Sequence, residues 1–296
     1  MKKTILITGG TGLIGQALAG RLTNLGHCVK ILGRKANAKA AIPVYAWDIE
    51  KMVVDAQAFD GVDAIIHLAG ANISEGRWTE ERKNEIIDSR TKSTQLLYQF
   101  LSTHPHCVKH ILCSSAIGIY GDRGDEWLNV PSSIGKGFLA EVCEKWENAL
   151  HVFDQLPVDL TINRLGIVLS KEGGAFQPIQ QSIIGPFGAI LGGGLQYISW
   201  IDLEDLVDLF IYQMDHHSIG TFHGVTGQLT FASLIQKIQK AKFPYFSILM
   251  PIPSFALRLI LGEKSRIVLD SQRCAIALPK GFEPKTDIDA FIQKAI

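Results

Sequence analysis

Three glycines near the start of the chain have a spacing that suits phosphate binding. The apolar run Ile5–Ile7 leads into Gly9, Gly12 and Gly15, and an amphipathic stretch follows. Gly9 can adopt a turn that a Cβ would forbid, Gly12 would let the backbone approach a pyrophosphate, and Gly15 would let the next helix pack closely on the strand. This strand, turn and helix order predicts a dinucleotide site rather than an ordinary tight turn, because N–H groups at a helix start attract anions. The residues beside the glycines that we assign to the same site are Thr11, Leu13 and Ile14.

A cation stands where NAD-binding proteins usually carry an acidic residue. Arg34 follows the expected strand Cys28–Gly33 and lies about 20 residues beyond the glycine motif. A guanidinium suits the 2′-phosphate of NADP, whereas Asp or Glu would bind the 2′-hydroxyl of NAD. Arg34 therefore favours NADP(H) as the cofactor and argues against a methyltransferase. An ordinary solvated arginine is the alternative.

Two further strand ends offer contacts to such a cofactor. Asp48 follows an expected strand, where its carboxylate could meet the adenine amino group or equally well cap a helix start. Leu68, Ala69 and Gly70 lie at the end of another strand, and the two small residues would leave space for the cofactor beside the sheet. We interpret the neighbouring His67 as a packed, hydrogen-bonded residue rather than a catalytic one.

Composition and charge argue against several classes of function. The chain has 296 residues with 29 basic and 29 acidic side chains, and no basic block indicates nucleic acid or an anionic membrane. The apolar run after Met1–Lys3 is too short for a secretory signal, and Phe246–Leu261 is too short and interrupted to span a membrane. The five cysteines lack metal-type spacing and are typical of reduced cytosolic thiols. We expect a cytoplasmic monomer or homodimer that binds a small-molecule substrate and has no metal site and no nucleic-acid or membrane partner.

The first half of the chain alternates strands and helices, which predicts a doubly wound parallel α/β sheet of the Rossmann type. Most of the expected strands are continuous apolar runs, typical of parallel strands covered on both faces. These strands are Thr4–Thr8, Cys28–Gly33, Val44–Trp47, Ala64–Leu68, His110–Ser114 and Asp159–Leu165, and the longest expected helices are Glu80–Leu101 and Leu139–Phe153. We expect residues 1–226 to form the cofactor domain, with substrate-side loops at 171–194 and with Ile198–Leu209 returning a strand and a helix to the sheet. Residues 227–296 should form a smaller C-terminal cap.

Several motifs together resemble the extended short-chain dehydrogenase/reductases, which include nucleotide-sugar epimerases. The glycine motif, His67–Gly70, Ser114–Ala116 and Ile119–Gly121 carry the resemblance. The sequence is most similar to an epimerase-like branch sometimes labelled sugar-nucleotide epimerase or cell-division inhibitor. The signatures of that branch lie at Gly76–Trp78, Ser89–Arg90, Tyr120–Glu126, Gly137–Glu147, Arg164–Leu169 and Ser199–Asp205. The resemblance covers nearly the whole chain and implies an NADP-dependent oxidoreductase or epimerase that acts by hydride exchange on a small polar, nucleotide-sugar-like substrate.

The proton-transfer pair of the wider family is missing here. That pair, Tyr-x-x-x-Lys, follows the catalytic Ser or Thr, and no tyrosine of this chain has lysine at the fourth position after it. Counting from Ser115 places Phe138 and Val142 near the expected positions, and neither side chain can move a proton. The alternative to an enzyme is therefore an NADP-binding sensor or regulatory protein without catalysis.

Other residues could still serve a reaction. Ser115 is a candidate hydrogen-bond donor to substrate, although it could instead cap a strand end. Tyr120, Glu141 and Cys143 are the ionisable candidates, and a reactive Cys143 would need a lowered pKa. Guanidinium groups suit anionic substrates, whereas surface ion pairs are the competing interpretation. The substrate-binding candidates are Arg77, Trp78, Arg90 and Arg164.

Overall fold

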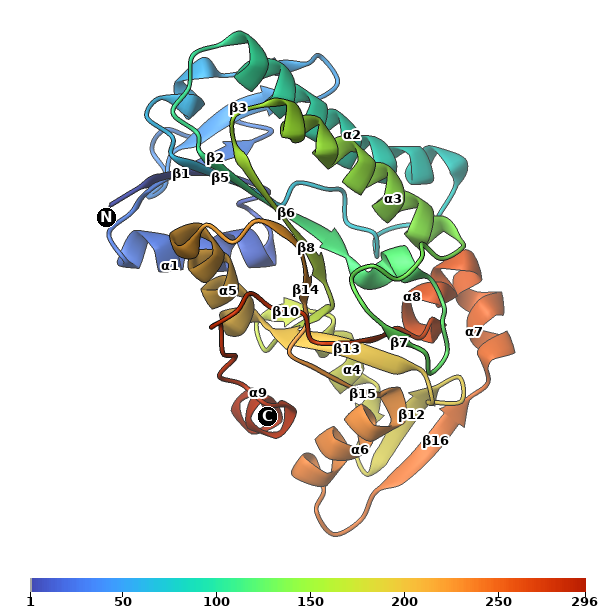
Figure 1. The fold of residues 1–296 in the computed structure, drawn as a ribbon. Helices are drawn as coiled ribbons and strands as arrows, with labels where there is room; N and C mark the ends of the chain where they lie inside the picture. The colour runs from blue at the N-terminus through green and yellow to red at the C-terminus, as the bar shows by residue number, and fades with distance from the viewer. Residues whose placement is uncertain (1) are drawn as a thin grey trace.

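The computed structural model describes residues 2–296, and its largest element is an eight-stranded sheet (Figure 1). From one edge to the other, the strands are β14 (Gly220–Gly224), β8 (Asp159–Leu165), β6 (His110–Ala116), β5 (Ala64–His67), β1 (Thr4–Thr8), β2 (Cys28–Gly33), β3 (Val44–Asp48) and β4 (Val53–Val54). All neighbouring strands are parallel except β3 and β4. The predicted doubly wound parallel sheet is confirmed, and each predicted strand ends within two residues of its observed end.

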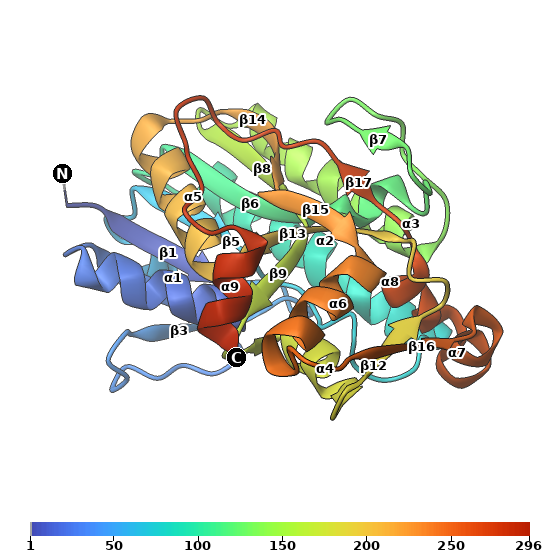
Figure 2. The same ribbon diagram turned by 90° about the horizontal axis from the view of Figure 1, so that it is seen from below.

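Helices cover both faces of this sheet because successive side chains of a strand point to opposite faces. On β1, Ile5 and Ile7 pack toward α1 (Leu13–Asn24) and α5 (Leu203–His216), which lie side by side in Figure 2. Leu6 packs toward α2 (Glu80–Thr103) and α3 (Phe138–Leu150) on the other face. The α-helix predicted to reach Phe153 ends at Leu150 and continues as a 3₁₀ helix, η3 (His151–Gln155).

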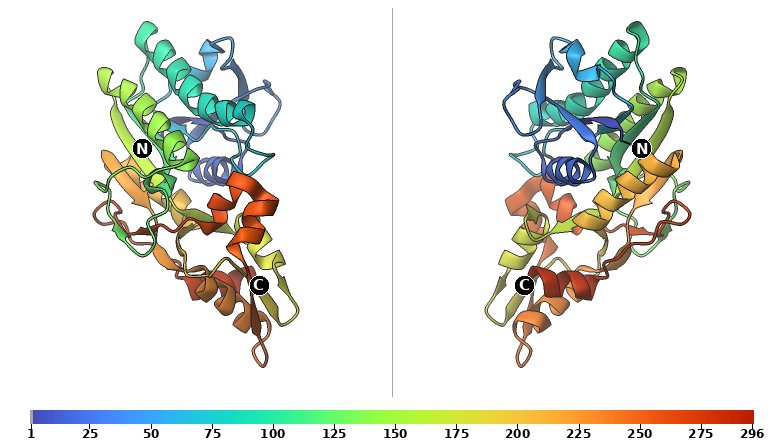
Figure 3. Two further views of the ribbon diagram at one scale, coloured as in Figure 1. Left: turned by 90° about the vertical axis from the view of Figure 1, so that its right-hand side faces the viewer. Right: turned by 90° about the vertical axis from the view of Figure 1, so that its left-hand side faces the viewer.

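Two smaller sheets build a second part of the molecule, which extends away from the main sheet (Figure 3). One contains β10 (Gly173–Gly174), β9 (Ile167–Ser170), β13 (Tyr197–Asp202) and β15 (Gly227–Thr230). The other contains β11 (Ile183–Ile184), β12 (Phe187–Leu191) and β16 (Ile248–Ile252). The strand expected to return to the main sheet is therefore β13, but it pairs with β9 and β15 instead, and only the following α5 returns to that sheet. The segment expected to form loops, 171–194, contains three short strands and a helix.

The C-terminal third adds helices and then crosses back to the main body. Its helices are α6 (Phe231–Lys242), α7 (Ser254–Leu261), α8 (Arg266–Leu269) and α9 (Ile288–Ala295), and the short helix of the preceding segment is α4 (Phe176–Gln181). The remaining elements are β7 (Trp127–Leu128), β17 (Arg273–Cys274) and the 3₁₀ helices η1 (Ala56–Phe59), η2 (Ile117–Tyr120) and η4 (Gly262–Ser265). β17 pairs with β7, and the carbonyl of Ala277 accepts from the N–H of His223 on β14. The chain end thereby packs against the main sheet.

The order of the strands marks the position of a ligand crevice. From β1 the chain proceeds to β2 and β3 on one side, then returns to β5 and β6 on the other. In open α/β sheets, ligands bind at the carboxyl ends of the strands where this reversal occurs. The glycine turn follows β1 at that point.

Candidate functional site

The glycine turn joins β1 to α1 through close backbone contacts. Gly9 has φ +69°, and a Cβ there would lie 2.9 Å from the carbonyl of Leu68. A Cβ on Gly15 would lie 2.3 Å from the carbonyl oxygen of Gly9. Both positions need glycine for the fold itself, because the helix start, the turn and the end of β5 are packed against one another.

Gly12 is different, because nothing in the protein requires a glycine there. Its φ of −80° and ψ of 170° suit any residue, and the nearest atom to an added Cβ is the Gly9 carbonyl oxygen at 3.4 Å. Gly12 is the N-cap of α1, no side chain caps that helix, and its first turn contains no acidic residue. Open space in front of uncapped N–H groups fits the phosphates of a dinucleotide.

A buried histidine fixes the segment opposite this turn. Thr8 Oγ1 accepts from the N–H groups of Leu68 and Ala69, at 3.1 Å each, and lies 2.7 Å from Nδ1 of His67. Since the Thr8 hydroxyl already accepts twice, its own proton goes to Nδ1, and Nε2–H donates to Thr94 at 3.2 Å. Burial lowers the pKa of His67 to about 3, so the ring is neutral. His67 is a structural residue, as the sequence indicated.

The remaining predicted cofactor residues surround the same crevice. Arg34 is exposed just after β2 and forms no ion pair with any residue of 2–296. Asp48 accepts from the N–H groups of Glu50 and Lys51, at 3.0 Å each, so it caps a turn. Its predicted contact with adenine stays a prediction. Leu13 contacts the hairpin at Gly174, where an added Cβ would lie 3.1 Å from its side chain.

The other members of the predicted cofactor set complete the turn and the segment opposite it. Thr11 is exposed and its carbonyl accepts from Gln16, whereas Ile14 packs partly buried against the core. Gly70 lies against the guanidinium of Arg90, 2.9 Å from the position of an added Cβ.

Several predicted reaction residues belong instead to one buried hydrogen-bond network. Ser115 donates to Glu147 at 2.6 Å, and Arg164 binds the same carboxylate through Nε and Nη2 at 2.9 and 2.7 Å. Nη1 of Arg164 donates to the hydroxyl of Tyr120 at 2.7 Å. Tyr120 lies 2.6 Å from Nε2 of His223, whose Nδ1–H donates to the carbonyl of Ala275, so the tyrosine donates to the histidine.

This network leaves its members little freedom to act on a substrate. Ser115 and Tyr120 are almost fully buried, and burial raises the pKa of Tyr120 to about 12 although Arg164 opposes this. Burial disfavours the charge of Arg164, but Glu147 holds its pKa above the ordinary value. These hydrogen bonds occupy all three side chains, and their predicted roles toward a substrate stay predictions. Sequence reasoning named Glu147 only as the end of the Gly137–Glu147 signature, without a role, and did not single out His223.

The start of α3 shows what occupies the place of the missing proton-transfer pair. Phe138 and Val142 are buried, and Trp78 packs edge-to-face on Phe138 with ring centroids 4.8 Å apart. Glu141 lies on the exposed side of the helix, paired with Lys145 at 2.7 Å. The remaining ionisable candidate, the buried Cys143, has its pKa raised to about 12 by burial although Arg90 opposes this. The structure does not bring the four predicted reaction residues to one open site.

The residues predicted to bind an anionic substrate do not meet at one place either. Arg90 is largely buried over the ring of Trp146, donates to the carbonyls of Ile86 and Ala71, and leaves its buried Nε without a partner. Arg77 is exposed, in a loop whose carbonyls at Ser74 and Gly76 accept from Lys264. Trp78 supports the loop by donating to the carbonyl of Ile73.

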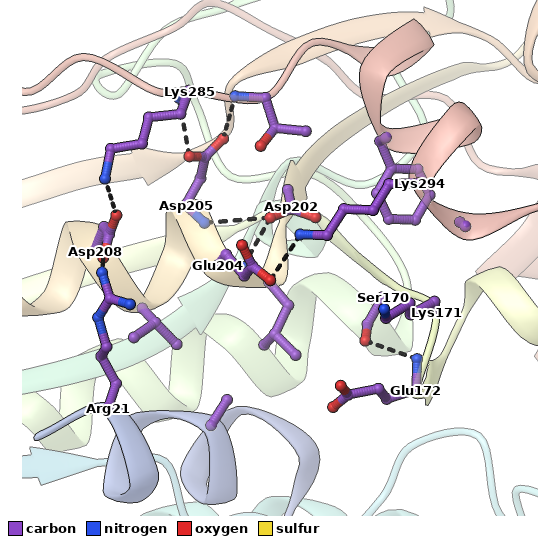
Figure 4. A pocket seen from close by; sticks show the side chains of 16 residues that line it. Arg21, Ser170, Lys171, Glu172, Asp202, Glu204, Asp205, Asp208, Lys285 and Lys294 are labelled. Carbon is purple, nitrogen blue, oxygen red and sulfur yellow. Dashed lines mark hydrogen bonds and ion pairs between the residues drawn. The ribbon is translucent and has the colours of Figure 1, made fainter. Parts of the chain in front are cut away.

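A cavity of about 400 Å³ is lined by residues of α1, α5 and α9 (Figure 4). Five of its charged side chains pair with one another, Arg21 and Lys285 with Asp208 and Lys294 with Glu204. Lys171 also lines the cavity, is exposed and forms no ion pair with residues 2–296. Within residues 2–296, no helix is long and apolar enough to cross a membrane, and no cluster of His, Cys, Asp and Glu could hold a metal ion.

The fold and the glycine turn define a nucleotide-binding protein of the Rossmann type. Residues 5–135 match the NAD dependent epimerase/dehydratase family. An epimerase family protein of Staphylococcus aureus is 30% identical over 92% of this chain and 90% of its own length. The chain belongs to this epimerase family.

Two solved structures are similar over nearly the whole chain. The human epimerase family protein SDR39U1, crystallised with NADPH, is 26% identical with a TM-score of 0.84, covering 99% of this chain and 98% of that one. A nucleoside-diphosphate sugar epimerase of Corynebacterium glutamicum is 28% identical with a TM-score of 0.75, covering 99% of this chain and 57% of that one.

Proposed function

We propose that the protein binds NADP(H) and uses it for hydride exchange, as an oxidoreductase or epimerase, on a small polar, nucleotide-sugar-like substrate. The observation that carries this proposal is Gly12, which has no role in packing and leaves open space at an uncapped helix start. A pyrophosphate would fill that space and accept hydrogen bonds from the first turn of α1.

Arg34 supports NADP over NAD. It is exposed at the carboxyl end of β2, without an ion-pair partner among the described residues, where a cofactor ribose would lie. The relative SDR39U1 was crystallised with NADPH, which agrees with this choice. The nucleoside-diphosphate sugar epimerase of Corynebacterium glutamicum supports the substrate class.

In the proposed reaction the hydride moves between the cofactor and the substrate, and the residues of the chain hold the cofactor in place. Bound NADPH would supply a hydride, or NADP⁺ would accept one. The first turn of α1 would hold the pyrophosphate, Arg34 the 2′-phosphate, and the segment fixed by Thr8 and His67 would support the cofactor beside β5. With all five cysteines as free thiols, we also propose a reducing compartment, the cytoplasm.

A non-catalytic NADP sensor is the second candidate function, and one observation favours it. Phe138 and Val142 are buried at the start of α3, and the nearby Ser115 and Tyr120 are held inside the network. Among the residues that we singled out for catalysis, only Glu141 is exposed at this end of α3, and it pairs with Lys145.

Titration of the purified protein with NADPH and NADH, followed by turnover assays, tests both candidates. We expect NADPH to bind about 10- to 150-fold more tightly, the value of one charge-assisted hydrogen bond. Slow oxidation of NADPH by carbonyl substrates such as 4-keto sugar nucleotides would support the enzyme. Tight binding without turnover would support the sensor. Failure to bind either nucleotide would contradict both.

A further inference from the structure

The three-stranded sheet of β11, β12 and β16 has one covered face and one bare face. On the covered face, a Cβ added to Gly188 would lie 2.7 Å from the side chain of Ile235 on α6. Ile190, two residues further along β12, belongs to the same core cluster as Ile235. Because successive side chains of a strand alternate, Phe187 lies on the opposite face, and it is 44% exposed.

The bare face is apolar on all three strands. Phe187 is paired in register with Ile184 of β11 and with Ile248 of β16, so the three side chains form a row across the sheet. Met250 lies two residues after Ile248, on the same face. None of these four side chains is charged, whereas the open face of a sheet in water is normally polar. This composition indicates a face that another surface covers.

The helix that follows β16 extends the bare face. Figure 1 shows β16 leading into α7, a helix of eight residues in which only Leu257 is buried. The one charged residue of α7, Arg258, lines a neighbouring cavity together with Asp270. A helix this short is marginal in water, because helices gain most of their stability by packing an apolar side against another element. The exposed large side chains of α7 are Phe255, Leu259, Ile260 and Leu261.

These four residues and the four of the sheet, which we call the apolar surface, offer enough area for a stable dimer. Their exposed fractions run from 39% at Ile248 to 85% at Leu259. At a mean exposure of about 60%, and about 150–200 Å² for a fully exposed residue of this size, they present about 700–1,000 Å². The largest apolar patch of a typical monomer is about 300–600 Å², and a standard interface buries about 800 Å² per partner. The apolar surface therefore has the area of an interface.

The edge of the sheet is less suited to a partner than its face. β16 is the last strand, and the backbone groups of Ile248 and Ile252 hydrogen-bond on the side of β12. Leu249 and Pro251 therefore face the free edge, since the direction of these groups alternates along a strand. Pro251 has no N–H, so within β16 only Leu249 could donate to a further strand. We expect the partner to cover the apolar surface rather than to extend the sheet.

We propose that a second copy of this chain covers the apolar surface, in a two-fold dimer that brings each α7 and each bare face against its equivalent. An uncharged surface fits itself, because a two-fold contact places identical groups together without like-charge repulsion. Interfaces between identical chains are also more apolar than those between different proteins. The 29 basic and 29 acidic residues leave no net charge to keep two copies apart. This inference is independent of the proposed function.

Sedimentation velocity of the full-length protein tests this dimer. Interfaces of this area have dissociation constants from µM to pM, so the protein should sediment as a dimer at about 10 µM. Leu259→Glu and Met250→Glu each place a charge in the contact, and each should weaken dimerisation about 30-fold or more, the effect of losing one central contact. Leu259→Met keeps the contact apolar and should stay dimeric. The matched control is Leu25→Glu, an exposed leucine at the end of α1 that should also stay dimeric.

The proposal is overturned if the wild-type protein sediments as a monomer, if both glutamate variants stay dimeric, or if Leu25→Glu dissociates as fully as they do. Circular dichroism shows whether each variant is folded, and the two glutamate variants lie on different elements, so either one alone decides the outcome. Monomeric protein that co-sediments with vesicles of phosphatidylcholine and phosphatidylserine, and loses this binding in Leu259→Glu, would assign the apolar surface to a membrane instead.

Discussion

At the scale of single residues, the three glycines of the turn differ in why each is a glycine: the fold requires Gly9 and Gly15, whereas Gly12 leaves space for a ligand. Gly9 and Gly15 are packed against backbone, so any side chain there would disturb the protein itself. A side chain at Gly12 would enter open space in front of the first turn of α1. Replacing Gly12 should therefore affect the ligand more than the fold.

We predict that Gly12→Val abolishes nucleotide binding and leaves thermal unfolding nearly unchanged, because a branched side chain would fill the space for the pyrophosphate. Calorimetric titration with NADPH measures the loss. Gly15→Val is the matched comparison, and it should destabilise the fold because its Cβ would lie 2.3 Å from the Gly9 carbonyl oxygen. Unchanged NADPH affinity in a folded Gly12→Val variant would show that the cofactor does not bind at this turn.

Arg34→Ala should weaken NADPH binding about 10- to 150-fold and change NADH binding little, because only NADPH carries the 2′-phosphate. Titration of the variant with both nucleotides measures the difference. An equal loss for NADPH and NADH would show that Arg34 does not bind the phosphate.

At the scale of elements, the strands of the main sheet and the glycine turn could be predicted from the sequence, but the strand pairing in the two smaller sheets could not. Continuous apolar runs and glycine spacing are local signals, so β1, β2 and β8 were predicted with their observed bounds. β13 is equally apolar, and its pairing with β9 and β15 depends on contacts distant in the sequence. For the same reason the hydrogen bonds of Ser115 to Glu147 and of Tyr120 to His223 could not be predicted, because these residues meet only in the fold.

His67 should make stability depend on pH, because it joins β1, β5 and α2 in its neutral form. Its pKa is about 3 in the folded chain, against the ordinary 6.5 when unfolded. Between these values the unfolded chain binds more protons, so the free energy of unfolding falls as the pH drops below 6.5. The fall is at most about 1.4 kcal/mol per pH unit.

Urea unfolding between pH 7 and pH 5 checks this prediction. His67→Gln should be less stable at pH 7 and lose less stability on acidification, whereas other buried histidines such as His110 act equally in both proteins. Identical losses in the wild type and the variant would contradict the neutral buried ring.

Tyr120→Phe should cost about 1–3 kcal/mol of stability, because it leaves Nε2 of His223 without a donor inside the network. Any NADPH turnover should change little, because the hydroxyl is buried and its pKa is raised to about 12. Chemical unfolding and steady-state kinetics measure the two effects. A fall in turnover of about 10²- to 10⁴-fold would instead identify Tyr120 as the proton donor.

At the scale of the whole molecule, the proposed crevice lies between the residues assigned to the cofactor and the start of α3. The glycine turn and Arg34 follow β1 and β2, and Phe138 and Val142 come after β6, on the other side of the strand reversal. No Tyr-x-x-x-Lys pair stands between them. We therefore predict that hydride transfer to ordinary carbonyls is slower than in relatives with that pair by about 10²- to 10⁴-fold, the usual contribution of positioned acid–base catalysis. Single-turnover kinetics measures this rate.

A crystal structure of the protein with NADPH tests the central claim most directly. We predict the pyrophosphate at the N–H groups of Leu13 and Ile14, the 2′-phosphate within hydrogen-bond distance of Arg34, and the nicotinamide toward the end of β6. NADPH bound elsewhere, such as in the cavity at Arg21 and Lys294, or with its 2′-phosphate away from Arg34, would contradict it.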